Sequence, residues 1–179
     1  HAAPLLSASA QVMSEEQNWQ TSVQGTSPEL FEIRNWQLRS GRRFSAAEVT
    51  NKARVAVLGK TVVENLFGQG ADPVGQQVRI NRIPYEVVGV AAEKGTSGRG
   101  EDSDDVVLIP ATTFGAKVQG GLQSYIRGTV FVSAISQEAT AQAQQGIEQL
   151  LRQRHKIRPG QEDDFNIRDL SEIAGAQQE

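Results

Sequence analysis

No apolar run in this chain is longer than a few residues, and the segment Val55–Leu58 is typical of their length. A helix that crosses a membrane needs about 20 predominantly apolar residues in a row. Hydrophobic residues nevertheless make up 38% of the 179 residues and charged residues 22%, which is too apolar for a disordered chain. The short runs therefore predict one globular domain, or two small ones that share a core, built from short strands and helices.

Strand and helix patterns alternate irregularly along the chain. We expect strands at residues 5–13, 21–25, 54–58, 106–109, 126–135 and 165–170, and a hairpin over 75–93 that turns at 81–84. We expect helices after Ser27-Pro28, with Ser27 as N-cap, over 60–67 with Gly68 as C-cap, after Ala111, and over 137–155 with Ser136 as N-cap. Residues 40–43, 94–105 and 115–124 are predicted to be turns or loops, and the unit formed by 126–135, 137–155 and 165–170 has the clearest pattern.

Charge and cysteine content exclude several classes of function. The formal net charge is −3, whereas general nucleic-acid binding needs a basic face to neutralise phosphates. The chain has no cysteine, which excludes disulfides, thiolate zinc sites and cysteine nucleophiles. It opens with His1 and without a methionine, so we expect it to be cut from a longer protein, with His1 either a tag remnant or a vector scar.

The sequence Gly59-Lys60-Thr61, placed between a strand and a helix, resembles part of a phosphate-binding loop. The full motif needs a glycine five residues before the Gly-Lys pair, so that backbone N–H groups can wrap around the phosphates. Arg54 occupies that position, and strand-forming residues fill the gap. We therefore interpret the segment as a helix start packed under a strand.

Nucleophilic catalysis has few candidate residues. Ser97 lies in a glycine-rich stretch, but Arg99 stands where a nucleophile elbow requires glycine. A Ser–His–Asp triad also needs a histidine base, and His155 is the one histidine besides the terminal His1. His155 lies in a basic run at the end of a predicted helix, so we interpret it as a solvated cap that complements the helix dipole.

The acidic runs contain carboxylates that could bind a hard cation, but they lack the spacing of a calcium-binding loop. Residues 101–105 carry four carboxylates, but Val106 stands where a calcium loop needs its third ligand. We predict a charged, flexible surface loop there and at 162–164. A catalytic pair of carboxylates from distant parts of the chain remains an alternative, because the fold and not the sequence spacing decides how close two such groups lie. The aromatic residues Trp19, Trp36, Tyr85 and Phe131 are expected mostly to pack in the core.

Several segments, taken in order, resemble the periplasmic core domain of MacB-type ABC transporter permeases. The resemblance covers roughly residues 8–175 and is carried by residues 22–44, 53–67, 72–75, 85–90, 104–110 and 150–155. Each segment alone consists mostly of glycines, turns and core residues. Their shared order and spacing make the resemblance specific.

The resemblance implies an α+β fold: a porter-like subdomain of strands and helices with an inserted mixed α/β subdomain called Sabre. By this likeness the porter-like subdomain comprises residues 1–27 and 122–174, and the inserted subdomain residues 28–121. The family has a further strand-and-helix segment before the point where this chain begins. We therefore expect the porter-like subdomain to lack its first strand–helix segment.

The same resemblance implies a function in export. The chain would be the extracytoplasmic domain of a permease at the periplasmic face of the inner membrane, coupling ATP-driven motion to efflux of a substrate. The implied partners are a periplasmic adaptor protein, an outer-membrane channel and a second copy of the permease, with membrane helices flanking the domain and no nucleic acid. We expect the loop 94–105 to contact a partner, because an exposed mobile loop can order on binding.

The family carries no catalytic residues in this region, so the resemblance implies no catalytic, cofactor-binding or metal-binding residue and no cofactor. The fragment itself would not be an enzyme, and the ATPase would lie elsewhere. The alternative from the residues alone is a soluble small-ligand-binding module or a carboxylate-based hydrolase. That alternative predicts an enclosed pocket with paired acidic side chains.

Overall fold

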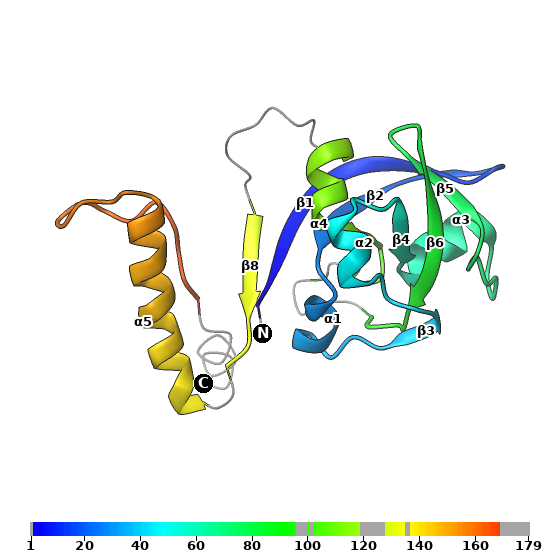
Figure 1. Ribbon diagram of the computed structural model, residues 1–179. Coiled ribbons are helices and arrows are strands. Elements are labelled where there is room, and N and C mark those ends of the chain that lie inside the picture. The colour runs from blue at the N-terminus through cyan, green and yellow to red at the C-terminus, as the bar shows by residue number, and fades with distance from the viewer. Residues whose placement is uncertain (1, 96–99, 101, 119–127, 135–136, 169–179) are drawn as a thin grey trace. The chain divides into compact units, whose positions relative to one another are not determined.

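The computed structural model describes residues 2–95, 100, 102–118, 128–134 and 137–168 (Figure 1). The chain divides into two compact units, an N-terminal unit of residues 1–132 and a C-terminal unit of residues 133–179. The strands are β1 (Ala2–Met13), β2 (Asn18–Thr26), β3 (Leu38–Gly41), β4 (Val55–Leu58), β5 (Gln77–Ile80), β6 (Ile83–Ala91), β7 (Val106–Pro110) and β8 (Gly128–Val132). The helices are α1 (Glu29–Ile33), α2 (Ala46–Thr50), α3 (Lys60–Phe67), α4 (Ala111–Thr113), which continues as a π-helical stretch over Phe114–Val118, and α5 (Gln137–Arg154).

Six strands of the N-terminal unit close into a mixed barrel in the order β2-β7-β4-β6-β5-β1. The barrel closes because β1 pairs antiparallel with both β2 and, over Val12 and Met13, β5. The β2–β7 and β4–β6 pairs are parallel, and the other pairs are antiparallel. Two strands lie outside this ring: β3 pairs with β6, and β8 pairs with the first half of β1. Closure gives each of the six strands a neighbour on both sides, although the β1–β5 and β4–β7 pairs are only two residues long.

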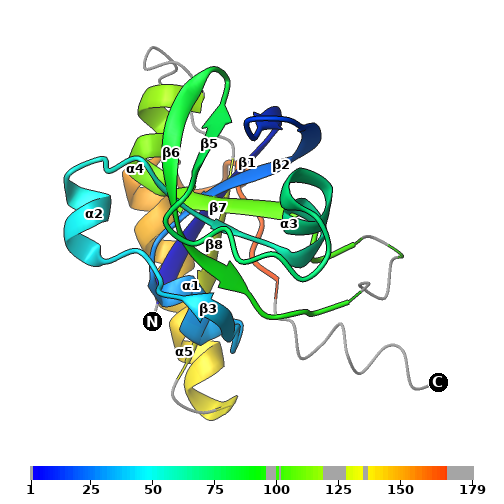
Figure 2. The same ribbon diagram turned by 90° about the vertical axis from the view of Figure 1, so that its right-hand side faces the viewer.

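The barrel interior is the main core, and it follows the two-residue period of the strands. Alternate residues of β1, β4, β5, β6 and β7 point inward, and α3 adds Val62, Val63 and Leu66 to the same cluster. Figure 2 shows the strands wrapped around this core with α3 beside it. The predicted helix over 60–67 and its buried side are therefore confirmed. The inward-facing residues from the strands include Ala10, Val12, Ala56, Leu58, Val78, Ile80, Tyr85, Val87, Val107 and Ile109.

A second core covers the outer side of β4 and β7, so both faces of these strands are buried. It contains Phe31 from α1, Trp36, and Phe44, whose ring meets that of Phe31 edge-on at 5.9 Å between centroids. Burial on both faces explains why these two strands read as continuous apolar runs instead of alternating ones.

Helix α2 was not predicted, although the sequence carries its signal. The Ser45 hydroxyl accepts a hydrogen bond from the Glu48 backbone N–H, and the Glu48 carboxylate accepts one from the Ser45 N–H. This reciprocal capping box satisfies two N–H groups that a helix start otherwise leaves unpaired. The predicted Ser27 cap of α1, in contrast, is wrong, because α1 starts without a side-chain cap hydrogen bond.

The predicted hairpin is confirmed, with a tighter turn than expected. The turn consists of Asn81 and Arg82, which both have positive φ (50° and 67°), between β5 and β6. Two such residues form the turn type whose twist matches that of the flanking strands. The turn predicted at 40–43 is partly wrong, because Ser40 and Gly41 belong to β3 and pair with β6.

The predicted strand–helix–strand unit at the end of the chain is only partly present. Helix α5 agrees with the prediction, but β8 ends at Val132 and belongs to the N-terminal unit through β1. Residues 165–168 are not a strand, and residues 169–170 lie outside the described residues, as does the predicted cap Ser136. The strand prediction failed because apolar alternation alone does not supply a pairing partner.

Candidate functional site

The segment that resembles a phosphate-binding loop lies where β4 enters α3, and its backbone groups already have protein partners. The Gly59 N–H donates to the Val106 carbonyl at 2.8 Å, and the Thr61 N–H donates to the Asp104 carbonyl at 3.3 Å. A Cβ atom at Gly59 would collide with the Asp104 carbonyl oxygen. The glycine is therefore explained by close backbone contact, and two of the amides that could face a phosphate, those of Gly59 and Thr61, are already bonded.

The side chains of this segment are also engaged. The Lys60 ammonium lies 2.9 Å from the Glu93 carboxylate, and hydrogen bonding to Glu93 raises the pKa of Lys60. The Thr61 hydroxyl donates to the Asp102 carboxylate at 2.5 Å. Lys60 and Thr61, whose side chains would contact a nucleotide, are thus bound to acidic side chains of the protein itself. The interpretation of this segment as a helix start under a strand is confirmed.

The acidic residues that follow β6 form a clamp, which we define as Asp102, Asp104 and Asp105. The Asp104 carboxylate is 4% exposed and accepts the backbone N–H groups of Lys94 (2.8 Å) and Gly95 (2.9 Å). Asp102 accepts the Asp104 N–H at 2.9 Å through the oxygen that does not bind Thr61. These bonds tie the end of β6 to the start of β7 and to α3.

Asp105 extends the clamp to β2. Its carboxylate accepts hydrogen bonds from the Trp19 indole N–H at 2.9 Å and from the Thr21 hydroxyl at 2.7 Å. The prediction of a charged, flexible surface loop is therefore wrong for Asp104, which is buried, and for Asp105, which is half-buried. Asp102 is exposed as predicted, although its carboxylate also accepts hydrogen bonds. Residues 96–99 and 101, and with them the nucleophile candidate Ser97, lie outside the described residues.

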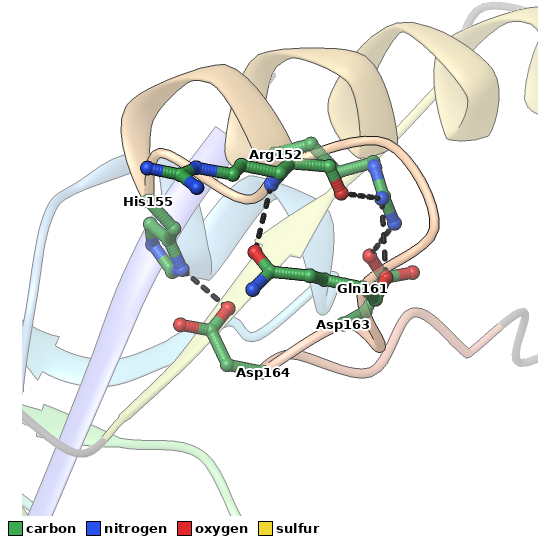
Figure 3. A network of polar contacts seen from close by, with 6 residues as sticks. Arg152, His155, Gln161, Asp163 and Asp164 are labelled. Atoms are coloured by element: carbon green, nitrogen blue, oxygen red, sulfur yellow. Dashed lines mark hydrogen bonds and ion pairs between the residues drawn. The ribbon is translucent and has the colours of Figure 1, made fainter.

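His155 lies in the C-terminal unit at the end of α5, and the segment with Gln161, Asp163 and Asp164 returns along that helix (Figure 3). Its Nδ1 atom is 2.6 Å from an Asp164 carboxylate oxygen, and its ring meets Phe165 edge-on at 5.9 Å. Arg152 forms an ion pair with Asp163 in the same segment. His155 and residues 162–164 are exposed to solvent, as predicted. The two contacts to Asp163 and Asp164 were not predicted, and they fasten the segment after α5 to the end of that helix.

The aromatic candidates mostly pack in the core, as predicted. Trp36 is 2% exposed and Tyr85 is 1% exposed, whereas Trp19 and Phe131 are half-buried. Burial raises the pKa of Tyr85, whose hydroxyl has no hydrogen-bond partner inside the barrel. The packing of these rings in and around the core leaves little ring surface for a stacked ligand.

An open depression of about 280 Å³ lies where the β1–β2 turn meets the end of α3. It is lined by residues 16–17 and 64–68, which include none of the four aromatic candidates. Its two carboxylates, Glu16 and Glu64, lie at an open surface and not in an enclosed pocket of the kind a ligand-binding module needs. In the described part of the chain, no three His, Asp or Glu side chains come together as a metal site would require.

A model of one protein family matches most of the chain. Residues 1–150 match the MacB-like periplasmic core domain. The chain belongs to this family. The resemblance found in the sequence is thereby confirmed: the chain is a MacB-like periplasmic core domain of a MacB-type ABC transporter permease. No helix within the described residues has the length and apolar character needed to span a bilayer.

Relatives of this MacB-like domain are much longer proteins. It is 41% identical over 173 residues to the macrolide export ATP-binding/permease protein MacB of Chlorobaculum tepidum, covering 97% of the chain and 26% of that protein. It is 32% identical to the pyoverdine export ATP-binding/permease protein PvdT of Pseudomonas entomophila, covering 87% of the chain and 23% of that protein. The chain thus spans about a quarter of the length of these relatives.

Solved structures share the fold of this MacB-like domain. The periplasmic region of MacB from Actinobacillus actinomycetemcomitans aligns with a TM-score of 0.78 at 20% identity, covering 98% of the chain and 74% of that structure. The extracellular domain of the ABC-type transporter YknZ from Gram-positive bacteria aligns with a TM-score of 0.74 at 18% identity, covering 88% and 77%. The predicted α+β fold is thus confirmed only in part: the domain is mixed α/β, with a six-stranded barrel-like sheet that was not predicted.

Proposed function

We propose that this domain couples ATP-driven motion of a MacB-type permease to the export of a substrate, without doing chemistry itself. The family match over residues 1–150 is the observation that carries the proposal. The names of the relatives combine an ATP-binding part with a permease, and the chain spans only about a quarter of their length. The ATPase would therefore lie in the remainder of the parent protein.

The construction of the N-terminal unit supports a mechanical role. Force passes through a domain without loss only when its elements do not shift against each other. The closed barrel, the core on both faces of β4 and β7, and the clamp at Asp102, Asp104 and Asp105 all hinder such shifts. A motion applied at one end of the barrel then moves the whole unit as a body.

The partners in this proposal are a second copy of the permease, a periplasmic adaptor and an outer-membrane channel, with membrane helices flanking the domain. The division into a porter-like subdomain (1–27 and 122–174) and an inserted subdomain (28–121) stays a prediction for the complete periplasmic region. So does the partner contact at 94–105, of which residues 96–99 and 101 lie outside the described residues. Exported compounds are named only for relatives, a macrolide and a pyoverdine.

The proposal can be tested in the parent transporter reconstituted in proteoliposomes. Residues 1–179 are replaced by a flexible Gly/Ser linker, and both ATP hydrolysis and export of a macrolide or a pyoverdine are followed. We expect ATP hydrolysis to persist and export to stop. A matched exchange with the corresponding domain of the Chlorobaculum tepidum relative, 41% identical, should restore export.

Two results would contradict the proposal. Export that continues in the linker variant shows that the domain is not needed for coupling. Loss of ATP hydrolysis together with export shows that the domain serves assembly of the permease instead. Export by the intact parent transporter is measured first, and the compound that it transports is then used for the variants.

A further inference from the structure

Two cations of the N-terminal unit are held over one buried indole ring. The Arg34 guanidinium lies 5.7 Å from the Trp36 ring centroid, and the Lys94 ammonium lies 5.0 Å from the same centroid. Arg34 also lies 5.6 Å from the centroid of Phe131 in β8. The Lys94 ammonium donates to the Arg34 backbone carbonyl at 3.0 Å. We call these two cations and Trp36 the Arg34–Lys94 cluster.

The charges of the Arg34–Lys94 cluster are poorly compensated within the part of the chain that the structure describes. Within the described residues, no ion pair joins either cation to a carboxylate. Asp104 is the acid that acts on Lys94 through its charge, but its carboxylate is already bound to the backbone N–H groups of Lys94 and Gly95. The other described basic residue that stacks on a ring differs, since Arg43 over Phe31 also pairs with Glu32 at 3.7 Å.

Holding these two charges together is unfavourable for the isolated domain. Desolvation lowers the pKa of Arg34, and desolvation followed by the charge of Arg34 lowers the pKa of Lys94. Ring stacking compensates part of this cost, because cations are attracted to the face of an indole. Both residues nevertheless remain exposed to solvent. An anion that approaches from solvent therefore meets two preplaced positive charges.

We propose that the Arg34–Lys94 cluster is a docking point for an acidic segment of a partner protein, whose carboxylates pair with the two cations. Carboxylates form charge-assisted hydrogen bonds with guanidinium and ammonium groups, and stacking on Trp36 limits the rotamers that binding must freeze. The inference goes beyond the transport function, since it concerns binding by the domain alone.

The observations favour a protein segment over an anionic membrane surface. Trp36 is 2% exposed and donates its N–H to the Ala92 carbonyl, so its ring cannot insert between lipids. The chain as a whole carries a net charge of −3, which an extended anionic surface would repel. A short acidic segment needs complementary charge only at the cluster.

The test uses the full chain labelled with ¹⁵N and a tetra-glutamate peptide blocked at both ends. The chain has two tryptophans, so the indole N–H signals of Trp36 and Trp19 give a reporter at the cluster and one at the clamp. We expect the Trp36 signal to shift saturably and the Trp19 signal to stay in place. The isosteric tetra-glutamine peptide should leave both signals unchanged.

Removal of the two charges should weaken peptide binding. The double variant Arg34→Gln/Lys94→Gln should bind the glutamate peptide at least about tenfold more weakly, the change expected when a charge-assisted contact is lost. If the peaks of the double variant are no longer dispersed, which would show that it does not fold, the single variant Lys94→Gln is used instead. Arg39→Gln, at an exposed arginine of β3 outside the cluster, is the matched control and should bind like the unaltered chain.

Three results would overturn the proposal. The first is a Trp36 shift with tetra-glutamine as large as with tetra-glutamate. The second is unchanged peptide binding by the double variant, or equal weakening by Arg39→Gln. The third is cosedimentation of the chain with phosphatidylglycerol vesicles that depends on Arg34 and Lys94, without binding of the peptide, which would assign the cluster to a membrane.

Discussion

Replacement of Asp104 by alanine tests whether the acidic clamp stabilises the fold. Asp104 is 4% exposed, and its carboxylate accepts two backbone hydrogen bonds, at 2.8 Å from Lys94 and 2.9 Å from Gly95. Truncation removes both acceptors and leaves two N–H groups without a protein partner. It does not touch the Asp104 backbone, whose carbonyl still accepts the Thr61 N–H.

The magnitude follows from these two bonds. A hydrogen bond to a charged group contributes about 1.5–3 kcal/mol to stability. Lys94 is exposed and Gly95 half-buried, so water can replace part of the loss and the lower end of the range applies. We therefore expect Asp104→Ala to lower the free energy of unfolding by about 3 kcal/mol, which corresponds to roughly 6–12 °C in Tm for a chain of this size. Asp104→Asn keeps one acceptor oxygen and should lose about half as much.

Tryptophan fluorescence during urea unfolding is the suitable assay. Both tryptophans, Trp19 and Trp36, lie in the N-terminal unit, so the signal reports on the unit that contains the clamp. Asp72→Ala is the matched control, because Asp72 is exposed and accepts weaker bonds from Ser40 (3.1 Å) and Val74 (3.2 Å). The control should cost less than about 1 kcal/mol. Equal losses in the two alanine variants would refute a stabilising clamp.

Three further predictions follow from the same structure. Gly59→Ala should destabilise the chain by about 2 kcal/mol in urea titrations, since its Cβ meets the Asp104 carbonyl, whereas Gly115→Ala, with open space at its Cβ, should be near neutral. Hydrogen bonding to Arg42 and Ser45 lowers the pKa of Glu48 from 4.5 to about 2, so its stabilisation is present above pH 4.5 and is lost as pH falls from 4.5 to 2. Solvent screens the Arg42–Glu48 pair, so Glu48→Gln should lower the free energy of unfolding by about 1 kcal/mol near pH 7. This difference from the unaltered chain should disappear as the pH falls to 2. A difference that persists at pH 2 would show that ionisation of Glu48 is not its cause. Calorimetry should detect no ATP binding at micromolar concentrations, because the amides of Gly59 and Thr61 are already bonded, and saturable heat would show that this interpretation is wrong.

The acidic run shows where interpretation of the sequence alone failed. Residues 101–105 have the composition of a solvated loop, and nothing in their spacing indicates which carboxylate is buried. Asp104 is buried because two backbone N–H groups just after β6 donate to it, and Asp105 is half-buried because Trp19 and Thr21 of β2 donate to its carboxylate. These donors are distant in sequence, so only the assembled fold identifies them. The capping box at Ser45 and Glu48, in contrast, has a local signal in the sequence, a serine followed three residues later by a glutamate.

The sequence alone determined those features that depend on residues close together in the chain. The helix at 60–67 with Gly68 after it, the hairpin over 75–93 and the order of family segments were all predicted correctly, because each depends on side-chain period, on backbone φ or on residues within a few positions of each other. Only the tertiary structure decided that β1 closes the barrel against β5, that β8 joins β1, and that Arg34 and Lys94 share one indole ring. These arrangements arise from hydrogen bonds and packing between strands far apart in the chain, for which no local pattern encodes the partner.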